Sequence, residues 1–337
     1  MVNRRRAAAA LFVFGVAFST SHPATAETGE IRIAQQFGIS YLPLIVMKER
    51  HLLEQAMAET GMPVPTVTWA QFSGAAAMND ALISNNLDVA TAGVGPMIIV
   101  WARTHGSLKM SGIAALGAMP NVLTTSNPNI KTLADFTEKD RIALPAVKIG
   151  AQAVMLQMAA EQAFGEGQQN RLDDITVSMA HPDAAAALIG GGSEIDAHFT
   201  SPPFSDQELA TPRIHKVLSN YDQMGGPATF NVLYAAERFH DANPKTYGAL
   251  LVTLDRAMAA IKADPTAAAA LYIKAENSKL SPAFVEGIIR NPENDFTTTP
   301  LQTFKTAQFL YKTGAIKVAP ASWKDLFFPE IHDRAGS

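Results

Sequence analysis

The chain has 337 residues, no cysteine, and 27 basic against 31 acidic side chains, which gives a formal net charge of −4. This length is enough for two lobes with separate hydrophobic cores. The absence of thiols excludes disulfides, thiol catalysis, cysteine-ligated zinc and a lipid-modified cysteine anchor. The acidic balance is unlike the basic surface of a nucleic-acid-binding protein, so we expect no nucleic-acid partner.

The first 26 residues have the three-part layout of a secretory signal peptide. Arg4 to Arg6 form a basic start, Ala7 to Phe18 form an apolar run, and Ala24-Thr25-Ala26 is a cleavage motif. The apolar run is shorter than the roughly 20 residues that cross a bilayer. Cleavage after Ala26 leaves 24 basic and 31 acidic side chains, a formal charge of −7. The sequence therefore predicts a soluble periplasmic protein without a lipid anchor.

From residue 31 onward, short apolar runs alternate with longer helical patterns, as in an α/β protein with a parallel sheet and crossover helices. Strands are predicted at residues 31–35, 64–71, 89–92, 111–116, 122–125, 141–144, 175–179 and 197–200. Helices are predicted at residues 42–53, 74–84, 96–104, 150–164, 182–190 and 202–210.

The pattern changes beyond Phe230, where amphipathic helices follow one another with few strand signals. These helices are predicted at residues 243–263, 265–275, 281–290 and 300–312. Each begins near a proline or a Ser/Asn cap, which suits the first turn of a helix. Turn residues at Met119-Pro120 and Gly225-Gly226-Pro227 mark the two places where the chain could cross between lobes.

Five junctions between a predicted strand and a predicted helix share one design, in which the strand ends in small or polar residues and the helix begins at once. They are Gln35-Gln36-Phe37, Phe72-Ser73-Gly74, Gly93-Val94-Gly95-Pro96, Lys148-Ile149-Gly150 and Thr200-Ser201-Pro202-Pro203-Phe204. Open α/β sheets bind ligands beyond the carboxyl ends of their strands, where helix N-termini present unpaired N–H groups. The junctions together predict a cradle for an anion or a strongly polar group.

Motifs for other chemistry are missing from the sequence. There is no glycine-rich dinucleotide or phosphate-loop motif and no Gly-x-Ser-x-Gly elbow, so we expect no cofactor and no enzymatic activity. The histidines are scattered without metal-ligand spacing, so we expect no metal site and interpret most of them as surface or capping residues. His198 is the exception, because it lies beside Thr200 at a strand end. Phe37 and Phe204 are the aromatic residues best placed to contact a solute.

Several stretches, in their order and spacing, resemble the substrate-binding proteins of transporters for nitrate, sulfonates, taurine and thiamine precursors. This family also contains thiamine-pyrimidine synthases. The matching stretches are Ile31–Ala34, Phe72–Ala77, Asn86–Ala90, Leu133–Phe136, Ile142–Pro145, Ser178–Leu188 and Ile195–Pro203. The resemblance covers nearly the whole mature chain.

The resemblance implies a two-lobed type II periplasmic-binding-protein fold in which the second lobe is inserted in the first. Lobe 1 would comprise residues 27–118 and 227–337, and lobe 2 residues 119–226. The family's loops would place around the solute Gln36, Phe37, Ser73, Gly74, Gly93, Gly150 and Thr200, to which the junction pattern adds Val94, Lys148, His198 and Phe204. Only Lys148 and Ser73 match the basic and hydroxyl groups that hold the anion in the sulfonate and nitrate branches. The charge of the solute therefore stays open.

The expected function is that of a monomeric receptor that encloses a small polar solute by hinged closure and delivers it to an ABC transporter permease in the inner membrane. The solute would be a sulfonate, a carboxylate or a heteroaromatic vitamin precursor. One alternative is a sensing protein that signals to a membrane partner. A weaker alternative is an enzyme like the pyrimidine synthases, which depend on a cysteine-rich iron motif that this sequence lacks.

Overall fold

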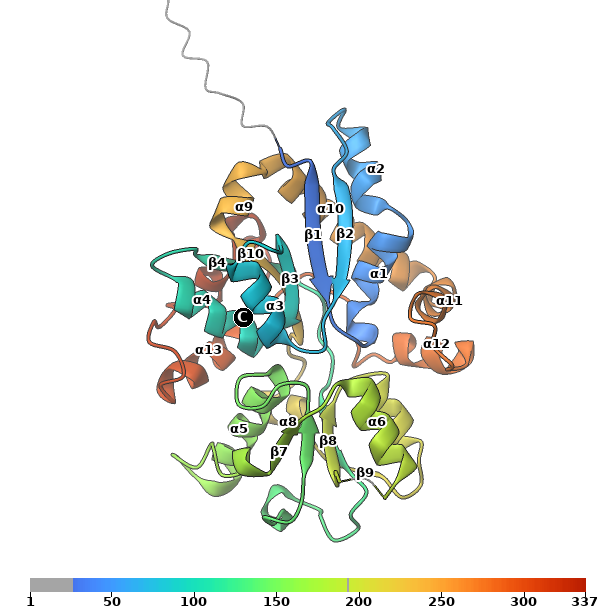
Figure 1. Cartoon of the computed structure of the whole chain (residues 1–337), viewed down its shortest axis with the longest axis vertical. Helices are drawn as coiled ribbons and strands as arrows, with labels where there is room; N and C mark the ends of the chain where they lie inside the picture. The colour runs from blue at the N-terminus through green and yellow to red at the C-terminus, as the bar shows by residue number, and fades with distance from the viewer. Residues whose placement is uncertain (1–26, 193) are drawn as a thin grey trace, which may run out of the picture.

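The computed structural model describes residues 27–192 and 194–337, and the predicted signal peptide lies outside these ranges. Within them the strands form two five-stranded sheets, one above the other in Figure 1. Each sheet has helices on both faces, and its inner strands are buried on both sides, whereas the edge strands are partly exposed. This arrangement confirms the predicted α/β fold with two lobes.

The first sheet combines four strands that precede the second lobe in the chain with one strand that follows it. Its strands, in order, are β2 (Thr66–Gln71), β1 (Glu30–Gln35), β3 (Val89–Gly93), β10 (Asn231–Ala236) and β4 (Met110–Ala115). Strand β1 is parallel to β2 and β3, whereas β10 is antiparallel to both of its neighbours. One face packs on α1 (Leu42–Glu49), α2 (Leu52–Glu59), α10 (Pro244–Ala263), α11 (Pro265–Ala275) and α12 (Pro282–Arg290). The other packs on α3 (Ala75–Ile83), α4 (Val94–Thr104) and α13 (Thr303–Lys312).

The second sheet repeats this pattern with an antiparallel strand in the fourth place. Its strands, in order, are β7 (Thr176–Ser178), β6 (Ile142–Leu144), β8 (Ala197–Thr200), β5 (Val122–Thr125) and β9 (His215–Ser219). Helix α5 (Ala151–Phe164) packs on one face and α6 (His181–Gly190) on the other. Shorter helices are α7 (Phe204–Leu209), α8 (Asn220–Met224) and α9 (Glu237–Ala242), with 3-10 turns η1 (Ile39–Tyr41), η2 (Leu133–Asp135), η3 (Asp173–Ile175), η4 (Trp323–Leu326) and η5 (Pro329–Ile331).

The two chain segments that connect the sheets run side by side. The N–H of Phe230 donates to the carbonyl of Gly117 at 3.1 Å, and the N–H of Leu116 donates to the carbonyl of Asn231 at 2.9 Å. A third segment joins them, because Ala118 and Asp295 exchange two backbone hydrogen bonds of 2.8 and 2.9 Å. The two covalent connections between the lobes therefore lie next to each other. The predicted lobe limits at residues 118/119 and 226/227 stay predictions.

Three local features differ from the sequence-based expectation. The sheets are mixed where a parallel sheet was expected, because β10 and β5 run against their neighbours. Strands β9 and β10 were not predicted, since a short apolar run such as that of β10 is ambiguous between a strand and a buried helix. The helix predicted at residues 42–53 is two helices, because His51 adopts a left-handed φ of 52° between them.

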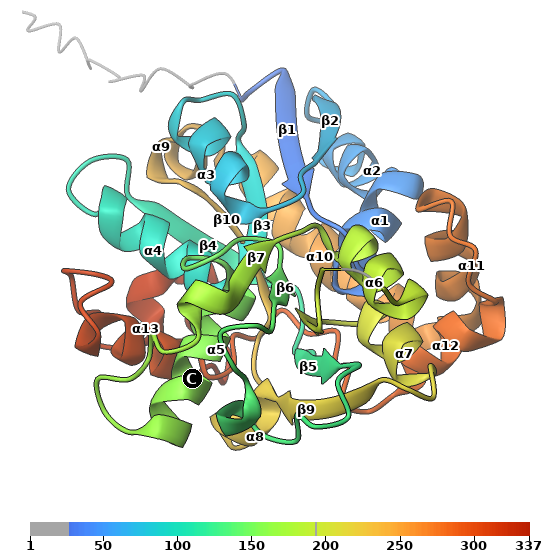
Figure 2. The same ribbon diagram turned by 60° about the horizontal axis from the view of Figure 1, so that its bottom comes forward.

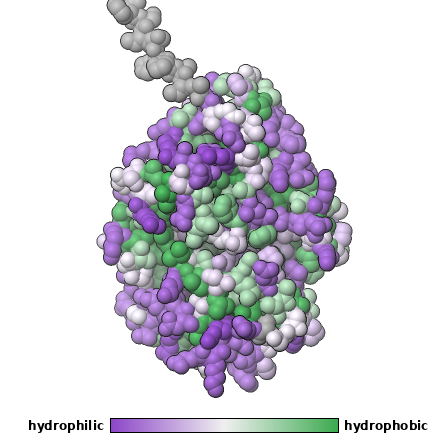
Figure 3. Space-filling model, viewed as in Figure 1, coloured by the Kyte–Doolittle hydropathy of each residue, from purple (hydrophilic) through white to green (hydrophobic). Residues whose placement is uncertain are grey.

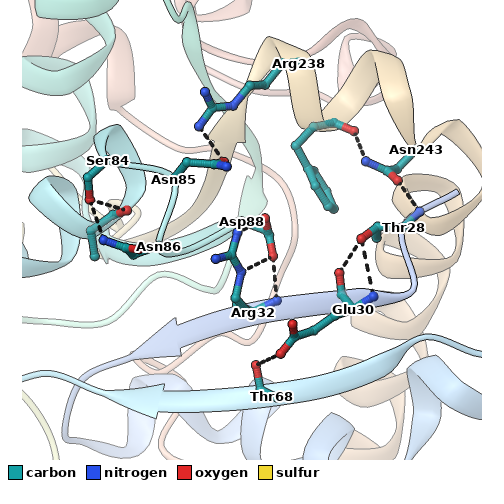
Figure 4. A network of polar contacts seen from close by, with 12 residues as sticks. Thr28, Glu30, Arg32, Thr68, Ser84, Asn85, Asn86, Asp88, Arg238 and Asn243 are labelled. Atoms are coloured by element: carbon teal, nitrogen blue, oxygen red, sulfur yellow. Dashed lines mark hydrogen bonds and ion pairs between the residues drawn. The ribbon is translucent and has the colours of Figure 1, made fainter.

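A polar network closes the amino end of the first sheet, the end away from the second lobe (Figures 1 and 4). The Arg32 guanidinium donates from Nε and Nη2 to the two carboxylate oxygens of Asp88, at 2.9 and 2.7 Å. The side chain of Asn243 accepts from the N–H of Thr28 at 2.7 Å. These contacts fix the start of β1, whose arrow points toward the second lobe in Figure 1.

Hydrophilic residues cover much of the face drawn in Figure 3, above all at its two ends, and more apolar residues gather along its middle. None of the helices in the described ranges combines enough length with enough apolar character to cross a membrane.

Strand β10 should make a large contribution to the stability of the first lobe. Leu233 is fully buried in the main core cluster, so we expect Leu233→Ala to lower the free energy of unfolding by about 2–5 kcal/mol. Urea denaturation measures this change. Val252→Ala is the matched control, because the side chain of Val252 is 47% exposed and its loss should change stability by less than about 0.5 kcal/mol. Equal effects of the two substitutions would contradict this assignment of the core.

Candidate functional site

A small enclosed cavity lies between the two sheets, at the carboxyl ends of their parallel strands. The first lobe lines it with Gln36, Phe37, Tyr41, Gly93, Phe230 and Asn231. The second lobe lines it with Pro145, Ala146, Gly150, Ala151, Gln152 and His181. The cavity volume is about 20 Å³, which is room for about one water molecule. A larger solute therefore requires the lobes to separate.

The two lobes touch through backbone and glycine positions around this cavity. The N–H of Ile39 donates to the carbonyl of Pro202 at 3.2 Å. A Cβ atom at Gly93 would lie 2.2 Å from the Cβ of Ala151, a distance that real side chains do not reach. A Cβ at Gly74 would lie 3.2 Å from the carbonyl oxygen of Pro145. Glycine at these strand ends thus allows the lobes to approach closely.

A larger groove of about 770 Å³ continues from the cavity toward the surface, and Phe37 lines both. The groove lies between α6 and α7 of the second lobe and the connection between α11 and α12 of the first. Figure 2 shows these elements beside one another. Its lining includes Phe204, Gln207, Glu276 and Lys279. This groove is the open side of the interlobe cleft.

Four helices from the two lobes begin at the cavity: α3 and α4 from the first lobe, α5 and α6 from the second. Their N-caps are Gly74, Gly93, Gly150 and Ala180, all in extended conformation and none with a capping side-chain hydrogen bond. The first N–H groups of a helix have no partner within the helix, and each N-terminus has a partial positive charge of about one half. The backbone therefore favours a negatively charged or strongly polar group in the cavity.

Within residues 27–192 and 194–337, the side chains that line the cavity include no Asp, Glu, Lys or Arg. The ionisable ones are Tyr41 and His181. Burial raises the pKa of Tyr41, so its hydroxyl stays neutral. Of these two, His181 is therefore the side chain that becomes a cation when it takes up a proton.

Behind His181 a chain of buried side chains leads away from the cavity into the second lobe. The Nδ1 of His181 lies 2.8 Å from the Nε2 of His198, and the Nδ1 of His198 lies 2.6 Å from a carboxyl oxygen of Glu208. The other Glu208 oxygen accepts from the Thr124 hydroxyl at 2.6 Å. The side chains of His198 and Glu208 are both fully buried. We call His181, His198 and Glu208 the relay.

Burial sets the protonation of the relay. It lowers the pKa of His198 to about 3 and raises that of Glu208 to about 8. Burial and the neighbouring His198 also place the pKa of His181 well below its ordinary value. Among the described residues, no group of three His, Cys, Asp or Glu side chains is placed to hold a metal ion. The relay is thus a set of hydrogen-bonded groups that favours overall neutrality.

Two side-chain amides complete the cavity wall. The Nε2 of Gln152 donates to Asn121 Oδ1 at 2.8 Å and lies 3.3 Å from the Nε2 of His181. The Nδ2 of Asn231 donates to the Ser40 hydroxyl at 2.8 Å, whereas its Oδ1 has no partner among the described residues although Asn231 is only 1% exposed. A buried polar atom without a partner is costly, so a polar group of a solute is a fitting partner for it.

The structure brings four of the predicted site residues together at the cavity, namely Gln36, Phe37, Gly93 and Gly150. Three others lie in direct contact with His181. The hydroxyl of Thr200 lies 3.1 Å from His181 Nδ1, His198 is in the relay, and the ring of Phe204 stacks on His181 at 5.6 Å. These three support a residue that reaches the cavity and do not line it themselves.

The remaining four predicted residues lie outside the cavity lining. Ser73 and Lys148 are exposed, and Lys148 has a left-handed φ of 65°. Gly74 lies at the lobe contact with Pro145. Val94 is buried, and its N–H donates to the carbonyl of Phe230 at 3.0 Å.

His181, Gln152 and Asn231 line the cavity but were not predicted as site residues from the sequence. His181 follows a predicted strand and begins a helix, the same design as the five recognised junctions, and this signal could have identified it. Asn231 lies on the unpredicted strand β10, and Gln152 lies two residues beyond the end of a recognised junction. The relay has no local motif, because its members are 17 and 10 residues apart.

The fold and the enclosed cavity define a two-lobed protein of the periplasmic-binding-protein type. The sequence matches the model of the NMT1-like family over residues 3–275, and the chain belongs to that family. No curated protein sequence matches it.

Solved structures share the fold at low sequence identity. The alkanesulfonate-binding protein SsuA from Xanthomonas axonopodis pv. citri, bound to MOPS, has a TM-score of 0.68 and 19% identity over 89% of this chain and 98% of its own. The aliphatic sulphonate-binding protein SsuA from Escherichia coli has a TM-score of 0.64 and 20% identity over 89% and 99%. The nitrate-binding protein NrtA from Synechocystis PCC 6803 has a TM-score of 0.66 and 15% identity over 89% and 84%. These neighbours are binding proteins.

Gly93→Ala should prevent the lobes from approaching as they do here, because the added methyl would overlap the side chain of Ala151. We expect a larger radius of gyration by small-angle X-ray scattering under conditions in which the unmodified protein is compact. Gly106→Ala is the control, since a Cβ there has nothing within 4 Å. A closed Gly93→Ala protein would show that this contact does not limit closure.

The stability of the protein should depend on pH through Glu208. Its pKa is about 8 in the folded protein against an ordinary value of 4.5, so the folded state keeps a proton that the unfolded chain releases. The contribution of Glu208 to the free energy of unfolding is complete below pH 4.5 and is lost as the pH rises to 8. The contribution of His198 has the opposite pH dependence and is complete above its ordinary pKa of 6.5. Above pH 6.5, the free energy of unfolding of the unmodified protein should fall by about 1 kcal/mol per pH unit relative to that of Glu208→Gln. Urea denaturation from pH 6.5 to 8 tests this, and parallel curves would contradict it.

Proposed function

We propose that this chain is the extracytoplasmic receptor of an ABC importer and that it captures a small polar or anionic organic solute between its lobes. The main support is the convergence of four helix N-termini without side-chain caps, two from each lobe, on one enclosed cavity. Sulfonates, carboxylates and heteroaromatic vitamin precursors fit this donor-rich backbone. The aromatic rings of Phe37, Tyr41 and Phe230 offer apolar contact to the organic part of such a solute.

Capture follows from the geometry as a hinged movement. In the open form the solute reaches the helix N-termini of one lobe through the groove beside Phe37. Contacts from the second lobe then add to those of the first, so the solute binds the closed form more tightly and shifts the population toward it. A ligand that favours the closed form by about 5.5 kcal/mol converts a population that is 99% open into one that is 99% closed.

The closed molecule acts as a monomer and presents both lobes to the permease in the inner membrane. A sensing role would use the same closure with a different membrane partner. Reconstitution distinguishes them, because a transport receptor loaded with solute raises the ATPase rate of its permease complex in proteoliposomes. An enzyme of the pyrimidine-synthase type is not supported, since the chain lacks the cysteines that this chemistry requires.

A thermal-shift screen tests the receptor function. The panel comprises methanesulfonate, butanesulfonate, taurine, nitrate, benzoate and a hydroxymethylpyrimidine, together with the neutral compound dimethyl sulfone. A solute at 100 times its Kd should add about 2.7 kcal/mol to the free energy of unfolding and raise Tm by several degrees. Small-angle scattering with the same solute should show compaction. Tight binding without any compaction would contradict capture by closure.

A further inference from the structure

An anion bound in this cavity needs a compensating positive group. No Lys or Arg side chain lines the cavity, and the one lining side chain that can become a cation, His181, is 93% buried. A histidine buried alone would resist protonation because its charge would have no compensating partner. The His181 side chain is different, since hydrogen bonds link it to a buried carboxyl group.

The geometry of the relay permits proton transfer along two hydrogen bonds. One arrangement that fits these two contacts has a proton on Glu208, whose carboxyl group would donate to Nδ1 of His198, while Nε2 of His198 would donate to Nδ1 of His181. If the first proton moves to His198 and the second moves on to His181, two charges appear together. Glu208 becomes a carboxylate, His198 stays neutral as its other tautomer, and His181 becomes an imidazolium. No proton enters or leaves the protein.

We propose that His181 is the specificity-determining residue for a negatively charged solute, and that Glu208 supplies its proton through His198. This inference rests on the proposed receptor function and names the solute class as an organic anion with a compact charged head. In this arrangement Nδ1 of His181 accepts from the relay and its Nε2 carries the hydrogen. The amide nitrogen of Gln152 lies 3.3 Å from that Nε2, so the two are donors side by side at the cavity wall. An anion at this N–H and at the helix N-termini stabilises the imidazolium form, and the Glu208 carboxylate balances the charge of the protein.

The surroundings of the relay contain no competing charge. The ionisable groups that face His181 are His198 from β8, Glu208 from α7 through His198, and Tyr41 from the other lobe across the cavity. Asp183, on the same helix as His181, is exposed to solvent. Asp206 of α7 is hydrogen-bonded to the hydroxyl of Ser205. The stacked ring of Phe204 and the hydroxyl of Thr200 hold the imidazole in place without adding charge.

Because the proton is already stored in the protein, the relay has a characteristic pH profile. The pKa of Glu208 is about 8, so below this pH anion binding takes up no proton and the Kd should be constant. Above it the store is empty, and the Kd should rise about tenfold per pH unit because binding must then take a proton from solvent. For a solitary buried histidine, the rise in Kd would begin at about pH 6.5, the ordinary pKa of histidine, or at a lower pH.

The experiment measures the Kd of methanesulfonate by isothermal titration calorimetry from pH 5.5 to 9.5 at constant ionic strength. Methanesulfonate is fully ionised throughout this range, so its own titration does not contribute. A constant Kd with a rise beginning near pH 8 supports the proposal. A tenfold rise per unit between pH 6 and 7.5, or no change up to pH 9.5, overturns it while leaving the receptor function intact.

Two variants and a spectroscopic signal separate the relay from a merely structural role. His181→Gln keeps a hydrogen-bond donor but cannot become a cation, and should raise the Kd of methanesulfonate about ten- to a hundredfold. In Glu208→Gln, the rise in the Kd of methanesulfonate with pH should begin below pH 7. Nitrogen-15 spectra of the histidine rings should show His181 changing from neutral to imidazolium when methanesulfonate binds. His215→Gln is the matched control, because the ring of His215 lies outside the relay, with its Nε2 2.7 Å from the carbonyl oxygen of Ile130.

Failure of the proposal and failure of the receptor function give different results. Binding of methanesulfonate with His181 still neutral overturns the proposal alone. Binding of dimethyl sulfone or the neutral pyrimidine, with no response to any anion of the panel, also overturns the proposal but supports the receptor. If Glu208→Gln does not fold, the pH profile and ring spectra of the unmodified protein decide the matter by themselves.

Discussion

The enclosure of a polar cavity without any Lys or Arg side chain in its wall is the constraint on which the rest of this structure depends. Removing charged groups from water costs more than most single contacts return, so an enclosed site must be neutral when empty. Among the described residues, the side chains of the wall are the amides of Gln36, Gln152 and Asn231, aromatic rings and one histidine, and the rest of the lining is alanine, proline and glycine. Its positive potential comes from helix N-termini, which add attraction for an anion without adding a charge that must be neutralised in its absence.

Close approach of the two lobes follows from the same constraint. Helix N-termini act only within their first turn, so they must be brought within contact distance of the solute from both sides. Glycine at residues 74 and 93 allows this, because a side chain at either position would meet the backbone or side chains of the other lobe. Enclosure of the cavity therefore depends on residues without a side chain as well as on residues with a polar side chain.

The sequence predicts the framework of the site better than its chemistry. Strand ends followed directly by helices are local patterns, and for this reason Gln36, Phe37, Gly93 and Gly150 could be identified at the cavity wall. The polar groups that distinguish this cavity depend on long-range pairing. Asn231 reaches it because the chain returns from the second lobe as an antiparallel strand in the middle of the first sheet, and no local signal specifies that return.

His198 shows the same limit from the other side. Its place at a strand end made it a candidate for solute contact, yet side chains of a strand alternate between faces, and its ring points to Glu208 and His181 within the second lobe. In this structure His198 therefore contacts the solute site only through His181, and its direct contact with a solute stays a prediction. Exposure of the predicted Ser73 and Lys148 has a comparable origin, because both lie in the loop itself, where a side chain faces solvent unless the opposite lobe covers it.

All members of the relay belong to one lobe, and this determines the order in which the site is assembled. Thr124, His181, His198 and Glu208 come from β5, α6, β8 and α7, which pack around the second sheet. The proton store is therefore complete before the lobes close, while the first lobe contributes neutral groups such as Asn231. We expect a solute to engage the second lobe first, where its charge can be matched. Closure of the first lobe then excludes water and strengthens the interaction by lowering the local dielectric constant.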